Sequence, residues 1–164
     1  MKPALLVIDV QNEFFNYNQV CSDSLKSAIQ YINVAIDLFR KKNHPIIAIQ
    51  HKSEEENLAP SKPGFDIPES VKLTPQDMRI VKTYSNSFTK TGLAEKLKEL
   101  GVDTVIVTGF CAEFCVLSTY KGAQDYDFTL IILRGSIAFD NAEHIRFVEE
   151  ITETITYGAL KTLL

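Results

Sequence analysis

The stretch TVIVTGFCAEFCVLSTY at residues 104–120 decides the fold of this chain. It begins with β-branched and apolar residues, passes through a Thr-Gly pair, and continues into a segment with helical character. A short apolar run that leads through a turn into a helix is typical of a buried strand in a parallel sheet. Two of the three cysteines of the chain, Cys111 and Cys115, lie in this turn. Their position at the end of a strand needs a chemical explanation.

Strand and helix patterns alternate along the rest of the chain. Residues 4–10 form an apolar run with one acid, which predicts a strand buried on both faces. Ser22-Asp23-Ser24 offers N-caps for a long helix, and Asn43-His44-Pro45 would end it. We expect further strands at residues 46–49, 78–81, 103–108, 128–133 and 159–163, and further helices at residues 93–100, 114–124 and 141–154. The alternation predicts one three-layer α/β/α domain over residues 1–164, with a mostly parallel, doubly wound sheet of about six strands.

The composition excludes several classes of protein. The 164 residues carry a net charge of −4, whereas surfaces that bind nucleic acid or anionic membranes need a basic patch. No apolar run approaches the roughly 18 residues of a membrane-spanning helix. The first apolar run ends at Asp9 without the cleavage site of a signal peptide. An odd number of cysteines argues against a secreted disulfide framework, so we expect a cytoplasmic protein without nucleic-acid or membrane partners.

The longest irregular segment spans residues 52–76. It holds four prolines and one glycine, with three glutamates near its start. A connection of this length inside a compact domain is uncommon unless it has a function of its own. We predict that it is a lid or a binding loop.

Three chemically active residues stand at predicted strand ends, where an open parallel sheet binds its ligands. Asp9 lies between two apolar residues near the end of the first strand, and a carboxylate in that setting needs a partner or its pKa rises. Lys82 follows the short predicted strand MRIV, and Cys115 follows the fourth strand. An acid, an ammonium and a thiol would therefore meet at one edge of the sheet.

These residue types together suit nucleophilic catalysis. A helix N-terminus and a nearby cation both lower the pKa of a thiol, and Lys82 would supply the cation. Asp9 would accept the proton of the Cys115 thiol and later deliver it to a leaving group. The backbone N–H groups of the turn before Phe114 would converge and bind an oxyanion. Each residue alone has a simpler structural explanation, since a buried cysteine is usually a small hydrophobe, but their coincidence favours a site.

Three sequence blocks resemble a known family. ALLVIDVQNEFF at residues 4–15 contains the pattern D-x-Q-N-x-F. The block IVKTYSNSFTKTGLAEKLKELGVDTVIVTGFCAEFCV at residues 80–116 has a lysine before a Ser-x-Phe and Thr-x-Leu stretch, then a strand that leads into Thr-Gly and Cys-Val. TYKGAQDYDFTLIIL follows at residues 119–133. In this order the blocks resemble the isochorismatase-like cysteine hydrolases, the superfamily that includes nicotinamidases, over most of the chain.

The resemblance implies a mechanism and an assembly. The family's triad of Asp, Lys and Cys would fall on Asp9, Lys82 and Cys115. A cis peptide bond would join Phe110 and Cys111, and the backbone N–H groups of Cys111 and Cys115 would form the oxyanion hole. Family members commonly pair through helices beside the site, so the resemblance also implies a homodimer or larger homo-oligomer.

The chain departs from the family at three places. Nicotinamidases bind a divalent metal through an Asp and two histidines after the second strand, whereas IAIQHKSEEENL at residues 47–58 has His51 alone. We therefore predict no metal and no cofactor. Ala112 stands where the family often has Thr, and LRGSIA at residues 133–138 replaces a common Asp-Ala pair. These two changes bear on which substrate is expected, and less on the assignment of the triad.

The function predicted from these features is hydrolysis of a small amide or related C–N substrate through a thioester on Cys115, without a metal. The candidate residues for an aromatic pocket wall are Phe14, Tyr84, Phe88, Phe110 and Phe114. Two alternatives stay open: a member of the same fold that binds a ligand or partner without turnover, and isochorismatase-type hydrolysis. A redox pair of Cys111 and Cys115 has the spacing C-x3-C instead of C-x-x-C, and no G-x-S-x-G or phosphate-binding glycine motif is present.

Overall fold

A parallel β-sheet forms the centre of the molecule. A computed structural model describes residues 1–55 and 57–164. The strands are β1 (Pro3–Ile8), β2 (Ile46–His51), β3 (Met78–Lys82), β4 (Thr104–Phe110), β5 (Thr129–Ala138) and β6 (Thr154–Ile155). They lie in the order β3-β2-β1-β4-β5-β6, and all five pairings are parallel. The strand order reverses between β1 and β4, which is where a doubly wound sheet binds its ligands.

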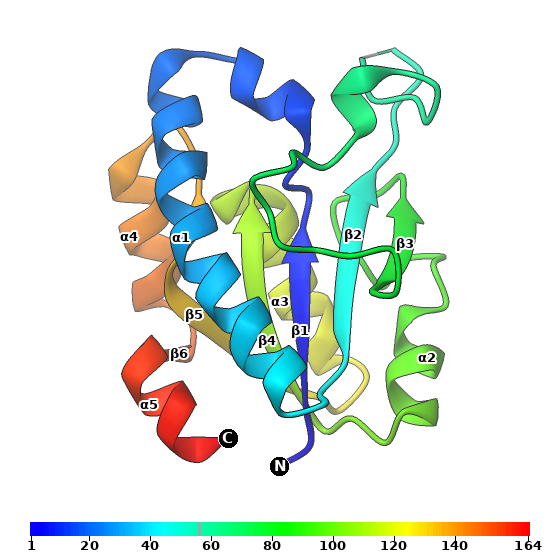
Figure 1. Ribbon diagram of the computed structural model, residues 1–164, viewed down its shortest axis with the longest axis vertical. Coiled ribbons are helices and arrows are strands. Elements are labelled where there is room, and N and C mark those ends of the chain that lie inside the picture. The colour runs from blue at the N-terminus through cyan, green and yellow to red at the C-terminus, as the bar shows by residue number, and fades with distance from the viewer. Residues whose placement is uncertain (56) are drawn as a thin grey trace.

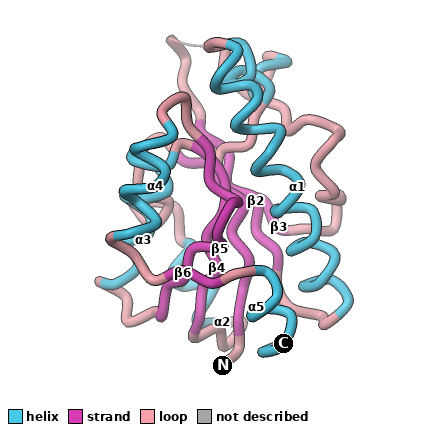
Figure 2. The backbone as a smooth tube through the Cα atoms, turned by 90° about the vertical axis from the view of Figure 1, so that its left-hand side faces the viewer, coloured by secondary structure: helices cyan, strands magenta, loops and turns pink. Residues whose placement is uncertain are grey.

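Helices cover both faces of the sheet. They are α1 (Gln19–Lys41), α2 (Leu93–Glu99), α3 (Leu117–Gln124), α4 (Ala142–Glu150) and α5 (Tyr157–Leu163). Short helical turns are η1 (Asn12–Asn16), η2 (Pro63–Phe65) and the π-helical turn η3 (Ala112–Val116). Residues of α1 and α5 pack on one face of the sheet, and residues of α2, α3 and α4 pack on the other (Figures 1 and 2). The structure thereby confirms the predicted three-layer α/β/α fold.

The central strand β1 supplies both halves of the core. All six of its residues are buried. Leu5 and Val7 point into the cluster under α1, whereas Leu6 and Ile8 point into the cluster under α2, α3 and α4. This alternation follows from the two-residue period of a strand. A continuous apolar run is therefore what a strand covered on both faces requires.

Helix α1 begins earlier than the sequence pattern predicted. Its N-cap is Asn18, whose side chain accepts a hydrogen bond from the N–H of Cys21 at 2.8 Å. Ser22 is instead a buried residue inside the helix. An asparagine side chain caps a helix as well as a serine does, so Asn18 and the predicted Ser22 could both serve as the N-cap. The upstream cap makes the helix about one turn longer. The predicted end is confirmed, because the helix stops at Lys41, just before Asn43 in the left-handed region with φ 56°.

The predicted strand at residues 159–163 is wrong. This segment is the helix α5, and its N-cap Thr156 accepts a hydrogen bond from the N–H of Ala159 at 3.3 Å. Leu160 is buried against the α1 side of the core. The sixth strand is β6, which begins at Thr154, the last residue of the predicted helix 141–154. A short apolar run fits a strand or one buried helix face equally well, and tertiary packing decides between them.

The irregular segment after β2 packs onto the site end of the sheet. It contains η2 and an isolated antiparallel bridge between Ser53 and Leu58. The buried Gln11 side chain donates to the carbonyls of His51 and Phe65, which joins this segment to the end of β1. Its role as a lid remains a prediction. Within the described residues, no helix combines the length and the apolar character needed to cross a membrane.

Candidate active site

Three strand ends bring an acid, an ammonium and a thiol into contact. Asp9 follows β1, Lys82 is the last residue of β3, and Cys115 lies in η3 after β4. Lys82 Nζ lies 2.7 Å from Asp9 Oδ2 and 3.3 Å from Cys115 Sγ. The residues are far apart in sequence, so the sheet creates this cluster. The structure places the three predicted triad residues together at the carboxyl edge of the sheet.

Two residues with positive φ lie where β1 and β4 meet the cluster. Asp9 adopts a left-handed conformation with φ 50°, which an aspartate tolerates better than most residues. Gly109 has φ 117°, and a Cβ there would lie only 2.0 Å from the carbonyl oxygen of Ile8. A glycine is therefore required for β4 to lie against β1 just before the nucleophile turn. The bond between Phe110 and Cys111 is cis, as the family resemblance implied.

The ion pair of Asp9 and Lys82 is fully enclosed. The side chains are 1% and 0% exposed, respectively. Lys82 Nζ also lies 3.4 Å from His51 Nδ1. Neither oxygen of Asp9 accepts a hydrogen bond of good geometry within the described residues, so the 2.7 Å contact is best described as an ion pair. Burying one of these charges without the other would cost several kcal/mol, so each depends on its partner.

The electrostatics of the cluster hold the thiol protonated at rest. Burial raises the pKa of Asp9, and Lys82 is the main group that opposes this. Burial, and then the Asp9 carboxylate, raise the pKa of Cys115 to about 12, although Lys82 lowers it. Lys82 lowers the pKa of the Cys115 thiol, as the sequence predicted, but burial raises that pKa by more. The thiol would therefore have to pass its proton to Asp9 as it attacks.

The other two cysteines have different surroundings. Burial and then Glu113 raise the pKa of the Cys111 thiol, so it is a poor nucleophile. Cys21 lies in α1, where its thiol donates to the carbonyl of Phe14 at 3.3 Å, and burial raises its pKa to about 11. All three cysteines are free thiols. Cys111 and Cys115 therefore form no disulfide.

A pocket of about 250 Å³ opens onto the cluster. Its lining consists of Asp9, Phe14, Tyr17, His51, Ser85, Phe110, Cys111, Phe114, Cys115 and Phe139. Three of the five predicted wall residues, Phe14, Phe110 and Phe114, belong to it. Two do not: Phe88 is buried in the core, where it stacks on Tyr126 and Phe128, and Tyr84 is exposed.

Sequence reasoning missed four lining residues. Tyr17 and Phe139 complete the aromatic wall, and His51 and Ser85 supply polar groups. Phe139 directly follows β5, so the strand-end rule would have found it if the strand had been predicted to its full length. The prediction considered His51 only as the lone histidine in the region where nicotinamidases have their metal ligands, and not as a pocket residue. Five of the ten lining residues carry Phe or Tyr rings, and no lysine or arginine occurs among the described lining residues.

The family's metal site does not fit the residues around His51. Within the described part of the chain, no three His, Cys, Asp or Glu side chains are grouped to hold a metal ion. The ammonium of Lys82 lies 3.4 Å from His51 Nδ1, where it would repel a cation. The described residues around His51 therefore do not form the ligand set that nicotinamidases are expected to use.

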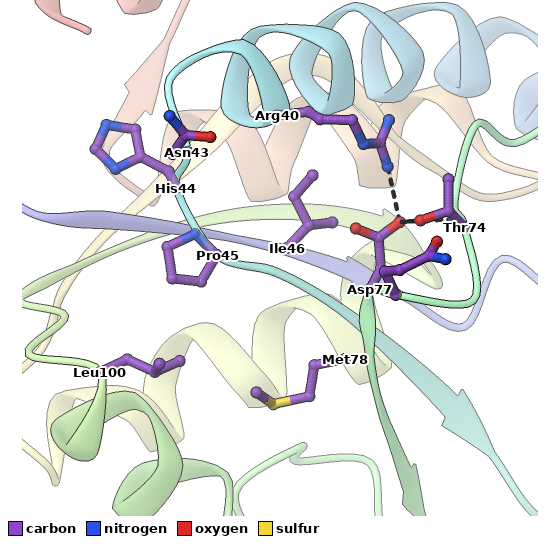
Figure 3. Close-up of a pocket in the computed structure, with 10 residues that line it drawn as sticks. Arg40, Asn43, His44, Pro45, Ile46, Thr74, Asp77, Met78 and Leu100 are labelled. Carbon is purple, nitrogen blue, oxygen red and sulfur yellow. Dashed lines mark hydrogen bonds and ion pairs between the residues drawn. The ribbon is translucent and has the colours of Figure 1, made fainter.

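A larger hollow of about 650 Å³ lies at the other end of the strands, away from the cluster (Figure 3). It is lined by residues from the end of α1, the start of β2 and the start of β3. Its charged groups already bind one another: Arg40 donates to Asp77 Oδ2 at 2.8 Å, and Asp77 also accepts from the N–H of Thr74 at 2.6 Å. Size alone does not mark this hollow as a site.

Comparison with known proteins identifies relatives over nearly the whole chain. The family model for the isochorismatase domain matches residues 3–151. The isochorismatase family protein YddQ of Bacillus subtilis is 29% identical over 175 residues, covering 99% of this chain and 97% of the relative. YrdC of the same organism is 33% identical over 141 residues, covering 84% and 75%. Nicotinamidase 3 of Arabidopsis thaliana is 26% identical over 155 residues, covering 85% and 75%.

Solved structures share the fold. An isochorismatase-like hydrolase from Alkaliphilus metalliredigens superposes with a TM-score of 0.89 at 22% identity, over 99% of both chains. N-carbamoylsarcosine amidase from Thermoplasma acidophilum gives 0.80 at 20% identity, over 95% of both chains. Pyrazinamidase of Pyrococcus horikoshii in complex with zinc gives 0.82 at 22% identity, over 96% of this chain and 100% of that one. At these identities the similarity is one of fold.

Proposed function

The chain belongs to the isochorismatase family, and from this premise we propose that it is a cysteine hydrolase acting on a small amide or related C–N substrate. The observation that carries the proposal is the position of Lys82 Nζ, which contacts both Asp9 and Cys115 in a buried cluster. A structural ion pair would need no thiol beside it. Two relatives named for amide hydrolysis, a nicotinamidase and an N-carbamoylsarcosine amidase, support this reaction class.

The proposed reaction has two halves. Asp9 accepts the thiol proton while Cys115 Sγ forms a bond to the carbonyl carbon, and the resulting oxyanion is held by the N–H groups of Cys111 and Cys115. Asp9 then protonates the leaving nitrogen, the C–N bond breaks, and a thioester remains. A water gives its proton to Asp9 and attacks the thioester. The C–S bond then breaks, the acid is released, and the Cys115 thiolate takes the proton back from Asp9. Lys82 stays charged throughout and holds the two anionic groups in place.

We propose that this chemistry needs no metal. The single histidine at the pocket and the ammonium beside it support this view. The zinc in the pyrazinamidase neighbour belongs to that protein. The test is hydrolysis before and after dialysis against a chelator, with metal content measured on the same samples. Loss of activity on chelation, restored by zinc, would contradict metal independence.

The main experiment is a mass-spectrometric screen for acylation of Cys115. The protein is mixed with a panel of neutral amides and ureas, quenched in acid within seconds, and digested. We expect the mass of the acyl group on the peptide that carries Cys115, and none on the peptide that carries Cys21. Release of the acid product without any acyl-protein in a single-turnover experiment, together with unchanged turnover after alkylation of Cys115, would refute the thioester mechanism.

The pH dependence should reflect the raised pKa of Asp9. Asp9 must be ionised to accept the thiol proton, and burial raises its pKa above the usual 3.8. As the pH falls, a base with a raised pKa becomes protonated earlier, so kcat/KM should decline at a higher pH than an ordinary aspartate would dictate. The profile is measured with a neutral amide, so that the substrate does not titrate. An acid limb at or below pH 3.8 would remove Asp9 from this role.

Phe139 should contribute to substrate binding. It lines the pocket edge-on to Phe114, with ring centroids 6.2 Å apart. Phe139→Ala should raise KM for an aromatic amide about tenfold, because it removes a flat apolar contact, and should change KM for formamide much less. Phe147→Ala is the matched control, since Phe147 lies exposed on α4 outside the pocket. Equal effects of the two changes would show that Phe139 does not select the substrate.

We also propose that the chain forms a homodimer or larger homo-oligomer, as the family resemblance suggests. Light scattering coupled to size exclusion gives the mass directly. A monomeric mass at working concentration would contradict this proposal.

A further inference from the structure

A carboxylate lies inside the turn that is proposed to bind the oxyanion. Glu113 stands midway between Cys111 and Cys115, and its side chain is 21% exposed. A negative charge beside the turn opposes the negative charge that develops on the carbonyl oxygen during attack. Glu113 also contributes, after burial, to the raised pKa of the Cys111 thiol. The turn therefore carries a charge that works against its proposed role.

A histidine from another element meets this carboxylate. Nδ1 of His144, on α4, lies 2.5 Å from Oε2 of Glu113. The His144 ring also stacks on Phe139, with centroids 6.1 Å apart and an interplanar angle of 14°. Phe139 is a wall of the pocket, so His144 contacts the turn and the wall at once. An imidazolium beside a carboxylate would offset its negative charge.

We propose that His144 is a positioning residue that neutralises Glu113, so that the N–H groups of Cys111 and Cys115 bind the oxyanion without an opposing charge. His144 is not among the residues that line the pocket, and it acts through Glu113. The proposal rests on the proposed function, because an oxyanion forms only when Cys115 attacks a carbonyl.

The contact between His144 and Glu113 could be a mechanical tether or could neutralise charge, and the two roles predict different effects of mutation. If the contact only holds α4 against the turn, removing either partner should be harmful, and removing both should be as harmful as removing one. If the contact neutralises charge, only the change that leaves Glu113 uncompensated should be harmful. A double-mutant cycle separates these cases.

The cycle uses His144→Gln, Glu113→Gln, the double variant and His144→Lys, with kcat and KM measured for one neutral amide. His144→Gln should lower kcat about tenfold with little change in KM, because the uncompensated charge opposes the transition state. Glu113→Gln in the His144→Gln background should restore kcat to within about twofold of native, and His144→Lys should retain it. Arg146→Gln is the matched control, since it breaks the exposed pair of Arg146 with Glu150 on the same helix.

A second measurement reads oxyanion binding without turnover. Benzaldehyde should add reversibly to Cys115: the Sγ–C bond forms, the carbonyl π bond opens, the thiol proton passes to Asp9, and the oxygen is held at the turn. Its dissociation constant is obtained from the protection of Cys115 against alkylation by iodoacetamide. His144→Gln should weaken benzaldehyde binding about tenfold, and the double variant should restore it.

The two measurements separate the two proposals. If native protein hydrolyses no amide but benzaldehyde binding follows the expected pattern, the proposed function is wrong and the role of His144 stands. If amides are hydrolysed but His144→Gln keeps the native kcat, the role of His144 is wrong. It is also wrong if the double variant or His144→Lys is as slow as a slowed His144→Gln. If benzaldehyde gives no protection in the native protein and no amide is hydrolysed, both are wrong.

Discussion

Cys115→Ser should lower amide hydrolysis by at least about a thousandfold, because loss of a catalytic nucleophile removes the covalent route altogether. Serine keeps the shape of the side chain, but its hydroxyl is a far weaker acid than a thiol and Asp9 would not deprotonate it. The fold should be unaffected, because Cys115 lies in a turn at the edge of the core. The measurement is kcat/KM with the best amide of the panel, together with a melting curve.

Cys21→Ser is the matched control for this prediction. Cys21 is buried, and its thiol donates to the carbonyl of Phe14, a bond that a serine hydroxyl also makes. Activity should stay within about twofold of native, because Cys21 is not among the residues that line the pocket. If Cys115→Ser retains more than about a tenth of native activity, Cys115 is not the nucleophile, and the two-step reaction has no basis.

Lys82→Met should destabilise the protein by about 3–5 kcal/mol at neutral pH, since it leaves the buried carboxylate of Asp9 without its partner. The sign of the pH dependence follows from the pKa of Asp9, which burial raises and Lys82 lowers. Without Lys82 that pKa rises further, so protonation of Asp9 favours the folded state. The stability deficit of Lys82→Met should therefore shrink as the pH falls. An aspartate whose pKa is lowered by a salt bridge behaves in the opposite way, because its contribution to stability is lost at low pH.

Asp9→Asn tests whether the unpaired carboxylate causes the stability loss of Lys82→Met. The double variant with Lys82→Met contains no buried charge, so it should recover most of the lost stability, whereas a loss of packing alone would persist. Lys72→Met is the surface control, because Lys72 and its partner Asp37 are each about half exposed, and it should cost less than about 1 kcal/mol. Chemical denaturation at pH 7 and pH 5 measures all four. A deficit in Lys82→Met that the double variant does not reduce would show that the ion pair is not its origin.

The sequence was sufficient to predict the cluster because the rules involved are local. Continuous apolar runs identify strands that are covered on both faces, and the ends of parallel strands meet at one edge. Asp9 and Cys115 come after such runs, whereas Lys82 ends the short, half-exposed strand MRIVK, which contains Arg79. Their shared place at the carboxyl ends of parallel strands is what predicts their proximity. The family resemblance, which the isochorismatase domain match confirms, adds the roles that remain to be tested.

The pocket wall was less predictable because aromatic residues serve the core and the pocket equally well. Phe88 and Phe114 look alike in sequence, yet the first is buried between Tyr126 and Phe128 and the second is largely exposed at the pocket. Phe139 was missed because the predicted strand stopped at residue 133. In the structure β5 continues through Gly135, whose φ of 81° few other residues adopt, and this added length carries the chain to the pocket.

The position of β3 in the strand order has a consequence for how the protein loses function. This strand pairs with β2 alone, so one side of it has no neighbouring strand in the described sheet. Lys82 is thus attached to a margin of the sheet, where local opening is easier than in the interior, whereas Asp9 and Cys115 follow interior strands. A brief local opening at this margin would withdraw the cation and leave the rest of the fold intact. We therefore expect the site to lose its cation through fraying of this short strand before the domain unfolds as a whole.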